Sequence, residues 1–235
     1  MVYLRIKIAD YIFEIDPHYE YSLKAAEGYH TDEKPDHYID IDKEYIIKKH
    51  EENENSFSPA YTEWLEIYRE ISAYIEEHDG ILMHGAVIGF EGAAYMFTAP
   101  SGTGKTTHIS QWKKLYGDKV TVINGDKPII RNIDGTFYVY GTPWCGKEHL
   151  NENTKAPLKG IAIVSRDAEN SVERIDASKY LPVLFRQIYF HNTANCISNA
   201  MDFLDKMLTQ VPLYSLKCNI STDAARVACE AMTKN

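Results

Sequence analysis

Several common sequence features are missing from this chain. Its four cysteines are widely spaced and form no C-x-x-C pair, so the sequence predicts neither a cysteine-ligated zinc site nor a redox motif. No apolar run has the length of a membrane helix, and the first residues mix charged with apolar side chains, unlike a secretion signal. Together these absences predict a cytoplasmic protein with reduced thiols.

Positive charge is also scarce. The 235 residues include 25 lysines and arginines against 34 aspartates and glutamates, which gives a formal net charge of -9. Such a balance disfavours nucleic acid and anionic membranes as partners, because both attract cationic surfaces. Hydrophobic residues make up 44% of the chain, which is enough for a buried core and argues against disorder.

The N-terminal part alternates between apolar and polar residues. The stretch "YLRIKIADYIFEID" predicts two strands joined near Ala9 and Asp10, and "HYIDIDKEYIIKKH" predicts further extended pieces. After Pro59, apolar residues from Trp64 to Ile75 recur at helical spacing, which predicts an amphipathic helix.

The remainder alternates strand and helix patterns and predicts an α/β protein with a mixed sheet and helices packed on it. The apolar runs on either side of "FEG" predict a hairpin, and "PIIRNIDGTFYVYG" predicts another, turned by Asp134 and Gly135. Helices are expected from Gly104 to about Tyr116, in "SKYLPVLFRQIYF", in "NAMDFLDKML" and from Ser221 or Thr222 onward. Strands are expected in "KVTVIN", "LKGIAIVSR" and "PLYSLKCNI".

Residues 99–107 read "APSGTGKTT" and match the phosphate-binding loop (P-loop) pattern G-x-x-x-x-G-K-[ST] except at the first position. Glycines let backbone N–H groups converge on a phosphate at a helix N-terminus. Lys105 is suited to bridging the β- and γ-phosphates, and the hydroxyl of Thr106 to binding Mg²⁺. We expect Lys105 to be exposed until ligand binds, and Ala99 to have a negative φ. The predicted ATP-binding residues are Ser101, Gly102, Thr103, Gly104, Lys105, Thr106 and Thr107.

Asp126 follows the strand "KVTVIN", 21 residues beyond Lys105. One helix and one returning strand fit in that interval, which would bring Asp126 beside Thr106. A carboxylate there is suited to holding Mg²⁺ or to orienting or deprotonating an attacking hydroxyl. The alternative is a turn aspartate before Pro128. His84, in "MHGA", is either a site residue or a hydrogen-bonded structural histidine.

The stretch "MHGAVIGFEGAAYMFTAPSGTGKTTHI" resembles the HPr kinase/phosphorylase family, and its loop is similar to that of phosphoenolpyruvate carboxykinases. The resemblance implies a single domain over 1–235 with an HPr kinase/PEP carboxykinase-like core, in which 1–56 is a β-rich part and 57–235 a helix followed by the kinase core. It implies that His84 lies close to the phosphates and that Asp126 is the first acid of an Asp-Asp pair. The ending "VPLYSLKCNISTDAARVA" is similar to the tails of small HPr-kinase-like proteins found with peptide-modification genes.

The chain departs from the family at two places. Lys127 stands where the second acid is expected, and "GTPWCGKEH" replaces the arginine- and glycine-rich region of HPr kinases. Both departures argue against HPr as the substrate. Within the replacement, Trp144 and Lys147 either shape the adenine or acceptor side of the cleft or belong to a packed loop. Cys145 has no base assigned to it, so a nucleophilic role is disfavoured.

The function predicted from these residues is that of an ATP- and Mg²⁺-dependent kinase. Its acceptor would be a hydroxyl, either on a serine or threonine of a peptide or protein or on a small metabolite. Arg131, Arg166 and Arg186 are candidates for stabilising the transferring phosphoryl group, and the sequence does not choose among them. The alternative is a regulatory or accessory protein that binds nucleotide without transfer, which Ala99 and Lys127 favour. A carboxykinase is disfavoured by the short chain.

Overall fold

The computed structural model describes residues 3–52, 56–189 and 194–234. The chain forms two compact units, Met1–Ile75 and Glu76–Asn235. Nearly all of the long helix α3 (Pro59–Glu77) falls in the first unit, whereas the division predicted from the sequence placed it after residue 56 with the kinase core. The assignment of residues 1–235 to one HPr-kinase-like domain stays a prediction.

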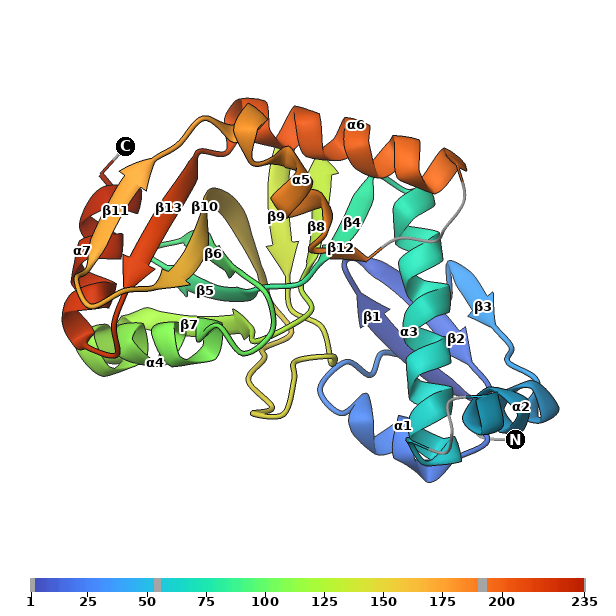
Figure 1. The fold of residues 1–235 in the computed structure, drawn as a ribbon. Helices are drawn as coiled ribbons and strands as arrows, with labels where there is room; N and C mark the ends of the chain where they lie inside the picture. Colours follow the sequence, from blue (N-terminus) through green and yellow to red (C-terminus); the bar gives the residue numbers. More distant parts are fainter. Residues whose placement is uncertain (1–2, 53–55, 190–193, 235) are drawn as a thin grey trace. The chain divides into compact units, whose positions relative to one another are not determined.

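The first unit begins with a hairpin (Figure 1). Strand β1 (Leu4–Ile8) pairs antiparallel with β2 (Tyr11–Ile15), which confirms the predicted pair. Ala9 and Asp10 have φ values of 52° and 66°. Two consecutive residues with positive φ match the right-handed twist of the flanking strands, which is why such two-residue turns join hairpins.

Helices complete this unit together with a short strand. The strand β3 (His37–Ile39) pairs parallel with β2, and the helices are α1 (Glu20–Ala25), α2 (Lys43–Glu52) and α3. The predicted extended structure is therefore wrong for residues 43–50. Asp42 explains the difference, because its Oδ1 accepts hydrogen bonds from the N–H groups of Glu44 and Tyr45, at 2.8 and 3.0 Å, and so begins α2.

The predicted amphipathic helix is confirmed as α3. It begins at Pro59, a residue whose fixed φ suits the first turn of a helix. Trp64, Ile67, Ile71 and Ile75 are all buried, as their spacing predicted. Burying such side chains contributes about 1.5–3 kcal/mol each relative to leaving them exposed.

The second unit is a large mixed sheet with helices on it. The sheet has the order β12-β4-β8-β9-β10-β6-β5-β7, and β13 pairs with both β10 and β11. The strands are β4 (Gly80–Met83), β5 (Ala86–Phe90), β6 (Ala93–Thr98), β7 (Val120–Asn124), β8 (Ile129–Ile133), β9 (Thr136–Tyr140), β10 (Lys155–Arg166), β11 (Ser171–Arg174), β12 (Ile188–Tyr189) and β13 (Leu213–Cys218). The helices are α4 (Lys105–Tyr116), α5 (Leu181–Phe185), α6 (Ala194–Gln210) and α7 (Thr222–Met232), with 3₁₀ turns at Gly117–Lys119 and Ala177–Lys179.

Most predicted elements of this unit are present. Both hairpins are confirmed, β5–β6 around "FEG" and β8–β9 around Asp134 and Gly135, which have φ values of 50° and 84°. The helix predicted in "SKYLPVLFRQIYF" is wrong beyond Phe185, because Ile188 and Tyr189 leave the helix to pair with β4. The last residue of that stretch lies outside the described residues. Strand β11 was not predicted.

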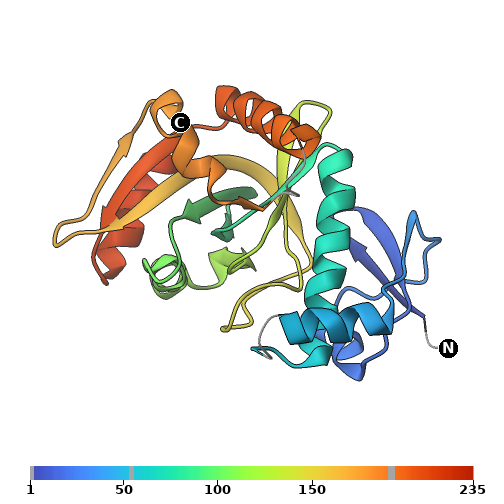
Figure 2. The same cartoon turned by 45° about the vertical axis from the view of Figure 1, so that its right-hand side comes forward.

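The helices lie on both faces of the sheet, which confirms the mixed α/β class (Figures 1 and 2). Along β6, Met96 belongs to the core cluster under α6, whereas its neighbours Tyr95 and Phe97 belong to the cluster under α4 and α7. This follows from the alternation of side chains along a strand. Across the described ranges, no helix combines the length and apolar character needed to cross a membrane.

Three parallel neighbours define one edge of the sheet. Strand β10 pairs antiparallel with β9 over its first residues and then runs parallel to both β6 and β13. Carboxyl ends of parallel strands meet at the same edge of a sheet, where α/β proteins bind ligands. Residues 99–104, Arg166 and residues 219–220 follow or end these strands and therefore share that edge.

The core under α4 contains a buried histidine that makes stability depend on pH. His108 Nε2 accepts a hydrogen bond from Trp112 Nε1 at 3.0 Å, and burial lowers the pKa of His108 from 6.5 to about 4. The native state keeps this ring neutral, while the unfolded chain takes up a proton below pH 6.5. Its contribution to stability is therefore complete above pH 6.5 and is lost as the pH falls toward 4.

We expect the titration of His108 to lower the free energy of unfolding by about 2 kcal/mol between pH 7 and pH 5. Urea titrations at the two pH values measure it. A His108→Gln variant keeps an acceptor for Trp112 without a titrating ring, so it should lose this step. An unchanged pH dependence in the variant would contradict the assignment.

Candidate functional site

The loop of residues 99–104, here called the glycine loop, joins β6 to α4. Within this fully described loop φ is positive only at Gly102 and Gly104, with values of 77° and 119°. Gly104 is the residue that precedes the first turn of α4. Ala99 is buried and has a negative φ, as predicted, so replacing glycine at this position strains nothing.

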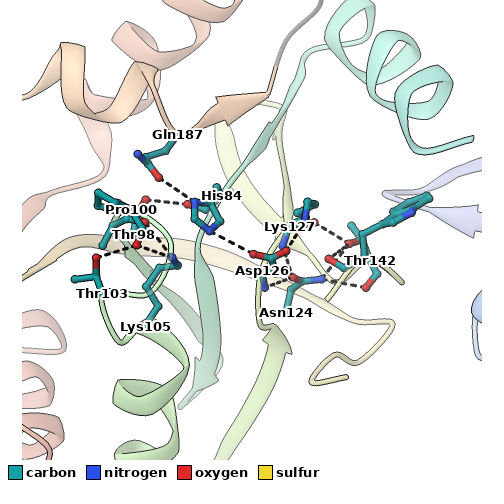
Figure 3. Close-up of polar contacts among 12 residues, drawn as sticks. His84, Thr98, Pro100, Thr103, Lys105, Asn124, Asp126, Lys127, Thr142 and Gln187 are labelled. Carbon is teal, nitrogen blue, oxygen red and sulfur yellow. Dashed lines mark hydrogen bonds and ion pairs between the residues drawn. The ribbon is translucent and has the colours of Figure 1, made fainter. Parts of the chain in front are cut away.

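Hydrogen bonds within the loop fix its shape. The N–H and the hydroxyl of Thr103 both donate to the carbonyl of Pro100, at 3.3 and 2.8 Å. Lys105 Nζ donates to the carbonyls of Ala99 and Pro100, at 2.9 and 3.4 Å (Figure 3). Lys105 is only 7% exposed, so the expectation of an exposed lysine is wrong. Its ammonium satisfies carbonyls at the strand end, and burial lowers its pKa.

Asp126 stands in a turn that is held by a buried amide. Asn124, the last residue of β7, accepts through Oδ1 from the N–H groups of Asp126 and Lys127, at 2.8 and 2.7 Å. Its Nδ2 donates to the carbonyl and the hydroxyl of Thr142, both at 3.0 Å. Asn124 and Thr142 are fully buried. Neither residue was predicted from the sequence, although an Asn whose side chain accepts from the N–H two residues ahead is common in turns.

The Asp126 carboxylate has two cationic or polar neighbours. His84 Nε2 lies 3.3 Å from Oδ1, and Lys127 Nζ forms an ion pair with Oδ2 (Figure 3). Burial acts to raise the pKa of Asp126, but the hydrogen bonds from His84 and Lys127 outweigh it and hold this pKa well below its ordinary value of 3.8. The carboxylate therefore stays ionised at neutral pH. Lys127 stands where the sequence pattern led us to expect a second acid, and its ammonium instead pairs with the neighbouring carboxylate of Asp126.

His84 lies between β4 and β5 and is tied to a distant segment. Its N–H donates to the Gln187 carbonyl at 2.7 Å, and its Nδ1 lies 3.0 Å from Gln187 Oε1. Its own carbonyl accepts from the Thr98 hydroxyl at 2.8 Å, and the next N–H, of Gly85, donates to the Asp126 carbonyl at 2.9 Å. Gln187 thus orients the ring that faces Asp126. Gln187 was not predicted from the sequence, because nothing local marks a partner 103 residues away.

One cavity of about 410 Å³, here called the first cavity, brings most of the predicted site residues together. Among the predicted site residues, Thr103 does not line this cavity. The predicted residues that do are His84, Ser101, Gly102, Gly104, Lys105, Thr106, Thr107 and Asp126. Asp126 and Thr106 therefore face one space, as the order of helix and strand predicted. The cavity also includes Lys147 and Arg166, which the sequence offered as candidates for the cleft and for the phosphoryl group, and it adds Gly125, Gly146 and Glu148, which were not predicted.

The segment "GTPWCGK" divides between core and cavity. Trp144 is 6% exposed, so the packed-loop interpretation holds for this residue. Cys145 is buried, and burial raises the pKa of its thiol, which disfavours a nucleophile. Gly146 and Lys147 line the first cavity.

The structure distinguishes the three candidate arginines. Arg166, at the end of β10, lines the cavity and donates from Nε to the Thr103 carbonyl at 3.0 Å. A second guanidinium nitrogen donates to the Gly102 carbonyl. Arg131 lies within β8, and Arg186 is exposed after α5. Arg166 therefore braces the glycine loop through its carbonyls and not through its N–H groups.

Two residues that line the first cavity carry oxygen donors. Thr106 offers a hydroxyl and Asp126 an ionised carboxylate, both oxygen donors of the kind that Mg²⁺ prefers. In the part of the chain that the structure describes, no group of three or more His, Cys, Asp or Glu residues is placed to hold a metal. Mg²⁺ in phosphate-binding sites is usually held by only one or two protein side chains, and phosphate oxygens and water complete its coordination shell.

No protein-family model matches this chain, and no curated protein does. Among solved structures, the HPr(Ser) kinase/phosphatase from Coxiella burnetii is similar over 65% of this chain and 97% of its own, with 6% sequence identity and a TM-score of 0.33. A likeness of this size does not place the chain in that family.

Proposed function

We propose that this protein is an ATP- and Mg²⁺-dependent phosphotransferase that acts on a hydroxyl group. The acceptor is a serine or threonine of a peptide or protein, or a small hydroxylated metabolite. The observation that carries the proposal is the first cavity, where the glycine loop and the start of α4 face the ionised Asp126.

The loop supplies the binding of the phosphates in this proposal. Gly102 and Gly104 have positive φ values, a conformation that lets the backbone approach a phosphate closely, and they lie at the positive end of the α4 dipole. Lys105 already donates to two loop carbonyls and would extend the same ammonium to the β- and γ-phosphate oxygens. Arg166 holds the loop carbonyls away from the phosphates.

Thr106 and Asp126 are the residues that would hold Mg²⁺. When bound, the ion neutralises the negative charge of the phosphates and of the developing transition state. The ammonium of Lys127 and the metal ion compete for the same carboxylate. The ammonium would therefore have to move away from Asp126 Oδ2 before the metal could bind there.

In the transfer step the acceptor oxygen bonds to the γ-phosphorus, and the bond from the γ-phosphorus to the β,γ-bridging oxygen breaks. ADP leaves with that electron pair, and the hydroxyl proton passes to the Asp126 carboxylate. Because its pKa is held low, Asp126 is a weak base, and its main contribution is to orient the hydroxyl. A loose phosphoryl-transfer transition state depends mostly on positioning and charge neutralisation, so a strong base is not required.

A second candidate function is nucleotide binding without transfer, in a regulatory or accessory protein. The ion pair between Lys127 and Asp126 favours it, because the ammonium occupies the carboxylate that chemistry would need.

Incubation with γ-labelled ATP and Mg²⁺ separates the two functions. The acceptors are serine- and threonine-containing peptide pools, the same pools with alanine at those positions, and small polyols. Label transfer to the hydroxyl-containing pools alone, or to a polyol, supports the kinase. Tight ATP binding without label transfer or ATP consumption supports the regulatory protein, and absence of ATP binding contradicts both.

A further inference from the structure

A second cavity, of about 540 Å³, adjoins the first at the same sheet edge. The two cavities share Gly104, Thr107 and Arg166 as lining residues. The volume is within the range of about 300–1,000 Å³ that small-molecule sites occupy. A molecule seated on the glycine loop can therefore continue past Thr107 into the second cavity.

The far wall of the second cavity comes from Cys218, the last residue of β13, and from Asn219 and Ile220, which follow the strand. Since β13 and β6 both run parallel to β10, the ends of these three strands enclose the space between the glycine loop and this segment. Figure 1 shows β13 leading directly into the turn before α7, and α7 packs against α4. Ligands of open α/β sheets bind at such carboxyl ends.

The wall is already fixed in place. The N–H of Asn219 donates to Asn170 Oδ1 at 2.9 Å, and its Nδ2 donates to the Ala168 carbonyl at 2.8 Å. Its Oδ1 accepts from the Ser221 hydroxyl at 2.6 Å. These bonds tie the segment to the turn after β10, so a ligand would meet a preformed surface and little ordering cost.

The chemistry of the wall fits a flat, partly apolar ring. Ile220 is 80% exposed, although it lines a cavity, so an apolar side chain is left facing solvent. Arg166 lines the same cavity and presents a planar guanidinium, a group that stacks on aromatic rings. The Asp167 carboxylate, also in the lining, is an acceptor for the amino group of a heterocycle.

We propose that the second cavity holds the nucleobase of the nucleotide whose phosphates occupy the first cavity. This inference rests on the proposed function, because it requires phosphates on the glycine loop. In this proposal Ile220 and Arg166 contact the base. Neither residue belongs to the phosphate-binding motif of residues 99–107.

The test compares ATP with tripolyphosphate, which has three linked phosphates and neither the ribose nor the base, by calorimetric titration in the presence of Mg²⁺. The parent should bind ATP at least about ten-fold more tightly than tripolyphosphate, as an apolar and stacking contact implies. Ile220→Ser should remove most of this difference and leave tripolyphosphate affinity within two-fold. Met201→Ser is the matched control, because Met201 is an exposed apolar residue on α6, 45% exposed and outside both cavities.

The outcomes separate the two proposals. If the parent binds tripolyphosphate and ATP equally, or if Ile220→Ser leaves the ATP preference intact, the base site is wrong and the phosphate site stands. If the parent binds neither ligand, the proposed function fails, and the base site fails with it.

Discussion

An Asp126→Asn variant is expected to bind nucleotide normally and to transfer the γ-phosphoryl group about 10²–10⁴-fold more slowly than the parent. Asparagine keeps the shape of the side chain and loses its charge. The site holds the Asp126 carboxylate ionised, and this carboxylate interacts more strongly with Mg²⁺ and with the acceptor hydroxyl as the hydroxyl loses its proton in the transition state than it does in the ground-state ATP complex. The loss should therefore appear in kcat with little change in KM, measured with one working acceptor.

Two variants control this result. Asp118→Asn removes a carboxylate that is fully exposed in the 3₁₀ turn after α4, and it should behave like the parent. Lys127→Met removes the ammonium from the ion pair but leaves the carboxylate, so kcat should stay within about ten-fold of the parent. If Lys127→Met were as slow as Asp126→Asn, the ion pair and not the carboxylate would explain the loss. Near-parent kcat in Asp126→Asn would remove Asp126 from the mechanism.

The parts of the site that the sequence predicted are those with short-range patterns. The strand, loop and helix around Gly102 and Gly104 are contiguous, so glycine placement and apolar runs specified them. The helix α4 and the strand β7 fill the interval between Lys105 and Asp126, so their lengths determine that the carboxylate returns to the end of the sheet where the helix begins. These local rules placed the glycine loop and Asp126 on one cavity without knowledge of any long-range contact.

The parts that the sequence did not predict depend on contacts between distant segments. The pairing of His84 with Gln187 spans 103 residues, and that of Asn124 with Thr142 spans 18. Neither partner is marked by a motif, since amides and hydroxyls occur everywhere on protein surfaces. The buried position of Lys105 was also not predicted, because it follows from carbonyls of the folded loop. Local patterns thus specify which residues enter the site, and tertiary packing specifies how they are held.

A Lys105→Met variant is expected to weaken nucleotide binding by roughly 10²-fold, the size of a lost charge-assisted hydrogen bond, and to abolish measurable turnover. Methionine retains the apolar stem and lacks the ammonium that reaches the phosphates. The carbonyls of Ala99 and Pro100 also lose their donor, so the free energy of unfolding should fall by about 0.5–1.5 kcal/mol. Calorimetric titration with ATP and urea unfolding measure the two effects separately.

Lys113→Met is the matched control for this variant. Lys113 lies on the same helix, and its Nζ likewise donates to a backbone carbonyl, that of Val120, at 2.9 Å. It is not among the residues that line either cavity, so its removal should cost similar or less stability and leave nucleotide affinity unchanged. Equal loss of binding in both variants would trace the effect to weakening of α4. Parent-like binding and turnover in Lys105→Met would show that the glycine loop is no phosphate site, because a loop that holds a triphosphate at the start of α4 cannot lose this ammonium without loss of affinity.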